Sequence, residues 1–204
     1  MNSRPRRSGK SSSQSRRGSG KMTQLLRKNA IVLVLIAICV FFGLMNPVFF
    51  SMTNVFNVLR QVAVVGIVAV GMTFVLLTGG IDLSVGSIIG VSAVLAAQAM
   101  LGGIPPVIAA LLALLAGAAL GFINGVWVNE LGIPPLVATL GAMTALRGVA
   151  FVITDGLPVF GFSETFKQLG QGYVWVIPIP VVIMAGVFLI GYVVLHYTAF
   201  GRYV

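Results

Sequence analysis

The sequence predicts an all-α, polytopic transmembrane helix bundle with about six spans. Two observations predict this fold class. First, 58% of the 204 residues are hydrophobic, 8% are charged and the mean hydropathy is +1.05, which lies outside the range of soluble globular domains. Second, Asp82 is the one charged residue between Arg60 and Glu130, so long apolar tracts fill the middle of the chain.

The basic residues are concentrated at the N-terminus. Nine of the 13 lie before position 29, with no acidic residue among them: Arg4, Arg6, Arg7, Lys10, Arg16, Arg17, Lys21, Arg27 and Lys28. We expect residues 1–28 to form a disordered cytoplasmic tail, because they lack apolar periodicity and flank the first span with positive charge. The tail has no aromatic residue for base stacking, so we expect no nucleic-acid partner; weak attachment to anionic lipid is an alternative role.

Residues 29–204 are expected to form the transmembrane domain, in which each span needs about 20 apolar residues. Breaks fall at Asn46-Pro47, at Gly79-Gly80, at Gly102–Pro106 and at Pro134-Pro135. The expected spans are about Ile31–Met45 (extended by Val48–Phe50), Val62–Thr78 with Arg60 and Gln61 at its entrance, Val85–Leu101, Val107–Val128, Pro135–Ile153 and Ile177–His196. Between the last two spans, Thr154–Tyr173 is interpreted as a loop with room for a short interfacial helix.

The charge of the tail predicts the orientation of the spans. An even number of crossings places both chain ends in the cytoplasm, so that Asp155–Lys167 faces outside and Thr198–Arg202 faces inside. A re-entrant turn at Gly79–Ser84, in place of a loop, would change this parity.

The segment Thr78–Ser87 places a carboxylate inside an apolar tract. A charged group there is costly unless it faces protein, water or a helix end, so Asp82 marks a functional or architectural site. Gly79-Gly80 ends one helix, and Asp82 or Ser84 can cap the next one. Capping suffices to explain both side chains, and direct contact with a transported solute is the alternative.

Two further polar residues are candidates for the translocation path or for helix organisation. Asn124 lies in the fourth span, where an interhelical hydrogen bond is the simpler interpretation. Arg147 lies about 10 Å along the fifth span from Thr154. Its side chain either snorkels to the outer interface or turns inward to bond helix-end carbonyls or Asp82.

A ridge of small residues predicts close helix packing. It recurs every four positions along the fourth span, at Ala109, Ala113, Gly117, Gly121 and Gly125. Such a ridge lets a second helix backbone approach closely, and Gly117, Gly121 and Gly125 are the expected packing positions.

The sequence offers few residues for catalysis or cofactor binding. It has no G-x-x-x-x-G-K-[ST] phosphate loop, one His, one Cys (Cys39) and four acidic residues. We therefore expect no catalytic, cofactor-binding or metal-binding residues, and ATP hydrolysis would require a separate subunit.

Gly80–Ser87 (GIDLSVGS), preceded by Ala69–Thr73 (AVGMT), resembles the signature of the ribose/xylose-type sugar permeases, the membrane subunits of bacterial ATP-binding-cassette importers. Further similar segments spread over about residues 30–204: Asn46–Leu59, Gly121–Gly125, Ile133–Gly141, Leu146–Gly148, Thr154–Val159 and Thr198–Tyr203. The resemblance implies a multi-pass protein of the bacterial inner membrane that imports a monosaccharide or similar small polar solute. It also implies three kinds of protein partner, namely a cytoplasmic ATPase subunit, a periplasmic or lipid-anchored solute-binding protein and a second permease subunit, in addition to membrane lipid.

Members of that family continue past the Gly-Arg-Tyr segment into a cytoplasmic coupling region and further helices, whereas this sequence stops at Val204. We interpret it as the N-terminal portion of a larger permease fold, which would not transport by itself. Two alternatives remain. One is a small homo-oligomeric channel or half-transporter that needs no ATPase, and the other is a membrane anchor whose basic tail recruits partners.

Overall fold

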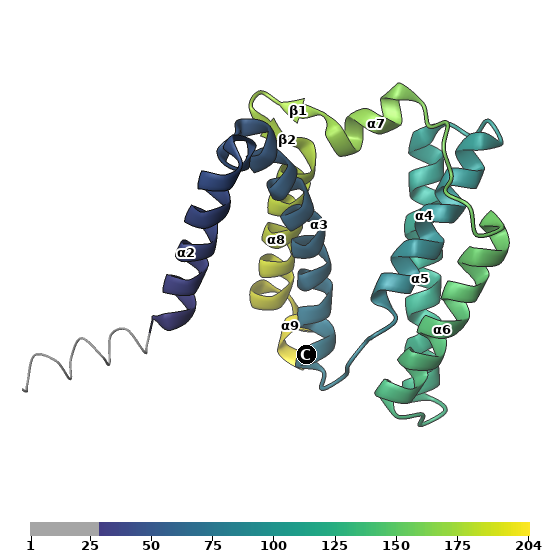
Figure 1. Ribbon diagram of the computed structural model, residues 1–204. Coiled ribbons are helices and arrows are strands. Elements are labelled where there is room, and N and C mark those ends of the chain that lie inside the picture. Colours follow the sequence, from purple (N-terminus) through teal and green to yellow (C-terminus); the bar gives the residue numbers. More distant parts are fainter. Residues whose placement is uncertain (1–28) are drawn as a thin grey trace, which may run out of the picture. The chain divides into compact units, whose positions relative to one another are not determined.

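The computed structural model describes residues 29–204 (Figure 1). The predicted basic tail, residues 1–28, lies outside the described residues. The described chain divides into two compact units, one that ends at Val55 and one that comprises Phe56–Val204. Its elements are α2 (Ala30–Met45), η1 (Pro47–Phe50), α3 (Met52–Leu77), α4 (Val85–Leu101), α5 (Pro106–Asn129), α6 (Pro135–Thr154), α7 (Glu164–Gln171), β1 (Tyr173–Val174), β2 (Ile177–Pro178), α8 (Ile179–Tyr197) and α9 (Ala199–Tyr203).

The first unit contains α2 and the 3-10 helix η1, which meet at the expected Asn46-Pro47 break. Asn46 adopts an extended backbone, and its side-chain oxygen accepts a hydrogen bond from the Val48 N–H at 2.9 Å. The amide of Asn46 thus caps η1, while Pro47 supplies the fixed φ of a helix start. Gly43 leaves room for the ring of Phe50, which a Cβ at that position would strike.

The start of α3 differs from the expectation. The helix begins at Met52, ten positions before the expected Val62, and runs for 26 residues. The Ser51 hydroxyl accepts from the Asn54 N–H at 3.2 Å and so caps the first turn. The charge-free tract marks the stretch that suits hydrocarbon, whereas a helix continues through polar residues such as Arg60 whenever its backbone bonds are satisfied. Arg60 therefore lies within α3 and not at its entrance.

The membrane character of the helices supports the predicted fold class. Four of them, α3, α5, α6 and α8, are long and apolar enough to cross a membrane, and α2 and α4 are shorter apolar helices of 16 and 17 residues. Residues 29–204 therefore contain six apolar helices, as many as the expected spans. The all-α, polytopic fold is thus confirmed.

The interior of the second unit is built from small side chains. Apart from Pro178, the buried apolar side chains of the described chain are alanines and one valine: Ala63, Val91, Ala96, Ala97, Ala109, Ala138 and Ala142. Large apolar side chains point outward instead, for example Leu114, Phe122 and Val152. Lipid is as apolar as leucine, so large residues gain nothing by leaving it, and small residues allow α4, α5 and α6 to pack backbone to backbone.

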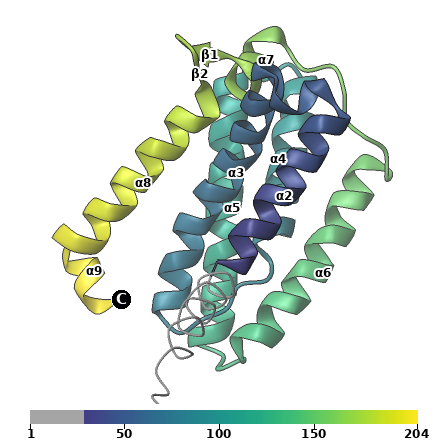
Figure 2. The same ribbon diagram turned by 60° about the vertical axis from the view of Figure 1, so that its left-hand side comes forward.

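The segment between α6 and α8 is more structured than expected. It contains α7, in the place foreseen for a short interfacial helix, and Lys167 bonds to Glu164 at 2.7 Å on its surface. A two-stranded antiparallel hairpin, β1–β2, follows and was not expected. Its second strand, β2, occupies Ile177–Pro178, where the last span was expected to start, so α8 begins at Ile179. Figures 1 and 2 show α7 and the hairpin at the end of the unit where α8 starts.

Candidate functional site

The helix break after α3 forms the centre of the site. Residues 78–84 are non-helical between Leu77 and Val85, which confirms the predicted interruption at Gly79–Ser84. Gly79 has φ +78°, a left-handed conformation in which a side chain would be strained, and this residue turns the chain away from α3. The loop therefore brings Asp82 to the start of α4.

Asp82 organises the beginning of α4 through one carboxylate oxygen. Its Oδ1 accepts hydrogen bonds from the Ser84 N–H at 2.8 Å and from the Ser84 hydroxyl at 2.6 Å. Ser84 is fully buried, while Asp82 is half-buried. The carboxylate thus satisfies two donors of a buried residue, as in an Asx turn. The Ser84 side chain makes no cap bond to α4, and the Asp82 carboxylate bonds to Ser84 itself, the residue that precedes the first residue of the helix.

Two other helices hold the loop from the side. Asn124 of α5 donates from Nδ2 to the Ser84 hydroxyl oxygen at 2.8 Å, and Asn124 is itself buried. The hydroxyl oxygen of Thr139, on α6, lies 2.8 Å from the Pro135 carbonyl oxygen and 3.3 Å from the Ile81 carbonyl oxygen. Hydrogen bonds therefore run from Asn124 through Ser84 to the carboxylate of Asp82, and each bond polarises the next. The structure brings these three predicted residues together.

A cavity of about 210 Å³ opens beside this network. The polar residues that line it are Thr78, Asp82, Asn124, Asn129 and Thr139. Among the described residues, no group donates a hydrogen bond to the second oxygen of Asp82. Carboxylate, amide and hydroxyl groups can together bind a polyhydroxyl compound, because each accepts or donates at least one hydrogen bond. We call this the Asp82 cavity.

The glycines of the small-residue ridge on α5 have two different surroundings. A Cβ built at Gly117 would lie 3.3 Å from Ser92 Oγ and 3.7 Å from Ile88 Cγ2, so Gly117 packs closely against α4. Gly121 and Gly125 line the Asp82 cavity, and a Cβ at either would meet no atom within 4 Å. A helix partner at these last two positions stays a prediction.

Arg147 does not join the Asp82 network. Its side chain is exposed, and among the hydrogen bonds and ion pairs within residues 29–204 none joins Arg147 to Asp82. Arg147 instead lines a separate cavity with Gly86, Gly90 and the buried Ser87. Its role as a path or organising residue stays a prediction.

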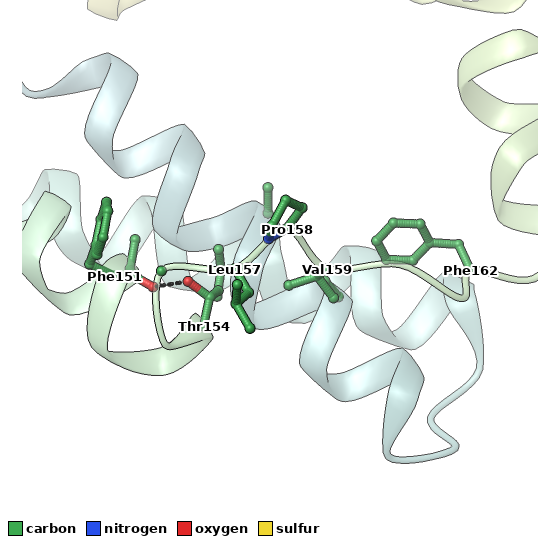
Figure 3. Close-up of a pocket in the computed structure, with 11 residues that line it drawn as sticks. Phe151, Thr154, Leu157, Pro158, Val159 and Phe162 are labelled. Carbon is green, nitrogen blue, oxygen red and sulfur yellow. Dashed lines mark hydrogen bonds between the residues drawn. The ribbon is translucent and has the colours of Figure 1, made fainter.

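A third cavity, of about 380 Å³, lies between α4, the end of α6 and the loop that follows (Figure 3). Phe151, Leu157, Pro158 and Phe162 contribute apolar surface to it. Thr154 supplies the one polar side chain among the residues that line it in the described chain, and its hydroxyl donates to the Ala150 carbonyl at 3.0 Å. This cavity is apolar, so the Asp82 cavity is the better candidate for a polar solute.

Thr139 belongs to the site although the sequence does not single it out. This residue is 3% exposed and ties α6 to the loop at Ile81. Its signal was weak, since a threonine in an apolar helix commonly bonds to its own backbone, as Thr139 also does at Pro135.

Comparison with known proteins assigns the chain to a family. Residues 54–204 match the profile of the family described as "Branched-chain amino acid transport system / permease component". No solved structure matches the chain significantly.

Several curated relatives are sugar permeases by name. Ribose import permease protein RbsC of Bacillus subtilis is 43% identical over 180 residues, which are 87% of this chain and 56% of the relative. The protein of the same name from Haemophilus influenzae is 41% identical over 184 residues, 88% of this chain and 57% of the relative. Xylose transport system permease protein XylH of Escherichia coli is 38% identical over 157 residues, which are 76% of this chain and 40% of the relative. The chain spans little more than half the length of the ribose permeases that it matches. The profile and these identities show that the chain belongs to the branched-chain amino acid transport system permease family.

Proposed function

We propose that this chain is the membrane-spanning permease subunit, or part of it, of an ATP-driven importer for a monosaccharide or similar small polar solute. The observation that carries this proposal is the 43% identity to a ribose import permease, which extends over 87% of the chain. The membership in a permease family also favours this function over a homo-oligomeric channel that acts without an ATPase. In this proposal a separate ATPase subunit hydrolyses ATP, a solute-binding protein delivers the solute and a second permease subunit completes the pathway.

The Asp82 cavity supports the choice of a polar solute. Its carboxylate, amide and hydroxyl groups lie within a protein whose interior is otherwise alanine-rich. Polar groups at membrane depth are costly, so their concentration around one cavity favours a role in the passage of a hydroxyl-bearing compound. In this proposal Asp82 and Asn124 border the path, and Ser84 holds Asp82 in place.

Deletion of the gene that encodes this chain tests the function. We expect uptake of one radiolabelled monosaccharide, from a panel that includes ribose, xylose and allose, to fall to background at micromolar concentration. The gene supplied in trans should restore the uptake, and depletion of cellular ATP should abolish it in the parent strain. Unchanged uptake of every sugar contradicts the proposal. Uptake that is lost on deletion, but persists in ATP-depleted parent cells, favours the channel instead.

We further propose that the chain lies in the bacterial inner membrane with its N-terminus in the cytoplasm. The support comes from the charges: nine basic residues precede position 29, and the positive-inside rule keeps such a segment on the cytoplasmic side. With an even number of spans, α7 and the hairpin then face the periplasm.

A cysteine at position 167 tests this orientation. Lys167 is exposed on α7, and Cys39 is the single native cysteine. In a Cys39→Ser background, we expect Lys167→Cys to react with a membrane-impermeant maleimide added to intact spheroplasts. A matched Arg202→Cys variant, in the C-terminal segment expected inside, should react after the membrane is permeabilised. The reverse pattern would show the opposite orientation.

A further inference from the structure

The tip of the β1–β2 hairpin has an unusual backbone. Val174 pairs with Ile177, so Trp175 and Val176 form a two-residue loop. Trp175 has φ +60°, and Val176 has no positive φ. A positive φ at the first of two loop residues is typical of a type II′ turn, where glycine is the usual residue. A tryptophan in this conformation is a strained choice, so its side chain must offer something that glycine lacks.

The indole of Trp175 makes almost no contact with the rest of the described chain. Trp175 is 98% exposed, and the neighbouring Val174, Val176 and Ile177 are exposed as well. Four consecutive apolar residues therefore project from the hairpin. Packing within the described chain does not offset the strain at Trp175, so the compensation must come from outside it.

The structure holds the hairpin firmly at its base. The Gly172 carbonyl accepts from the Ile179 N–H at 3.0 Å, which closes the hairpin against the first residue of α8. Arg60 of α3 donates from Nη2 to the Gln171 carbonyl at 2.9 Å, and its guanidinium lies 4.8 Å from the ring centroid of Tyr173. Phe56 packs edge-on against the same ring at 5.4 Å. The tip is thus presented in a fixed direction.

The hairpin continues directly into a membrane helix. Only Pro178 separates Ile177 from the start of α8, which is apolar enough to cross a bilayer. On its N-terminal side the hairpin follows α7 (Figures 1 and 2). Glu164 and Lys167 of α7 are solvent-exposed. The hairpin therefore lies where the chain changes from a charged surface to a lipid-facing one. Tryptophan and tyrosine are enriched at this boundary, because their rings are apolar and their polar groups can bond to headgroups.

We propose that the Val174–Ile177 tip is a lipid-binding element, which inserts the indole of Trp175 into the headgroup–acyl boundary of the bilayer at the start of α8. The partner is a phospholipid surface. Burial of the four apolar side chains in that boundary compensates the positive φ of Trp175. Arg60 and Tyr173 fix the depth at which the tip meets the lipid.

Tryptophan fluorescence tests this proposal, because the chain has two tryptophans. Trp127→Phe leaves Trp175 as the single reporter in the chain reconstituted into phosphatidylcholine vesicles. We expect a blue-shifted emission, with a larger loss of intensity in lipid brominated on the upper acyl carbons than in lipid brominated near the bilayer centre. Aqueous acrylamide should quench it weakly. If Trp127→Phe fails to fold, the difference between the native spectrum and that of Trp175→Phe gives the same signal.

Two outcomes would overturn the lipid contact. An emission maximum typical of indole in water, quenched by acrylamide and not by brominated lipid, would place Trp175 in solvent. A blue-shifted emission that brominated lipid does not quench would show that protein covers the tip. In that case, dilution in the vesicles would identify a second copy of this chain by a shift of the emission to longer wavelength. Neither outcome bears on the proposed transport function, which is tested separately by uptake.

Discussion

Replacement of Asp82 by alanine is expected to destabilise the fold by about 2–4 kcal/mol, because it removes the acceptor for two donors of a buried residue. Ser84 is 0% exposed, and both its N–H and its hydroxyl donate to Asp82 Oδ1. Each buried donor left without a partner costs about 1–3 kcal/mol, and hydrogen bonds to charged groups lie at the upper end of the usual range. The Asn124 amide would then bond to a hydroxyl that has itself lost its acceptor.

Asp82→Asn is the matched control. Its side-chain oxygen can still accept both hydrogen bonds, so it loses charge assistance but not the geometry, and we expect a cost of about 1 kcal/mol. Unfolding in mixed micelles with increasing SDS, followed by far-UV circular dichroism, measures the order of stability. An Asp82→Ala variant as stable as the native chain would show that the network does not stabilise the fold.

The same pair of variants separates the two roles predicted for Asp82. If the carboxylate binds the solute, Asp82→Asn loses uptake although it retains most of its stability. If Asp82 only organises the start of α4, Asp82→Asn transports normally and Asp82→Ala fails through misfolding. Uptake measured beside membrane protein level distinguishes these results.

The second large effect is expected from leucine at Gly117. A Cβ there already lies 3.3 Å from Ser92 Oγ, so a leucine side chain must push α5 away from α4. Overpacking destabilises a fold by about 1–3 kcal/mol. We expect a loss near the upper end of that range, because the leucine would separate two helices along a close contact. Gly117→Leu also gains helix propensity, by somewhat less than about 0.8–1 kcal/mol, which reduces the loss without cancelling it.

Gly121→Leu is the control for that substitution, since it makes the same chemical change one turn further along α5. A Cβ at Gly121 meets no atom within 4 Å, so we expect stability equal to or above that of the native chain. Its side chain would, however, extend into the Asp82 cavity and should abolish uptake. SDS unfolding and sugar uptake measure the two effects. Equal stability of the two variants would contradict the inferred packing, and normal uptake by Gly121→Leu would exclude the cavity from the path.

Much of the fold was predictable because local chemistry determines where the helices end. Asn46-Pro47 and Gly79-Gly80 are strong turn signals, and the apolar tract that follows Gly79-Gly80 predicts α4 with its observed bounds. The start of α3 was not predictable from hydropathy, because Ser51 caps a helix whose first turns are polar. The hairpin was missed because its turn has tryptophan at a position where glycine is the usual signal.

The candidate site was predictable in part, for a similar reason. Asp82 and Ser84 are near in sequence, and a carboxylate in an apolar tract attracts notice by itself. The partnership of Ser84 with Asn124, 40 positions away, depends on how α4 and α5 pack. The direction of Arg147 depends on tertiary structure as well, and for this reason both of its interpretations were open from the sequence.

The alanine-rich interior has a consequence for mutagenesis of this protein. In a water-soluble domain, truncation of core side chains to alanine reveals the core, because each large side chain that is removed leaves a cavity. Here most of the buried apolar positions are alanine already, and the large side chains face lipid. An alanine scan would therefore pass over the packing surface of α4, α5 and α6 almost without effect. A scan with leucine or phenylalanine would reveal the close contacts instead, such as the one at Gly117, because additional volume there has no room, whereas positions such as Gly121, which face a cavity, would accept it.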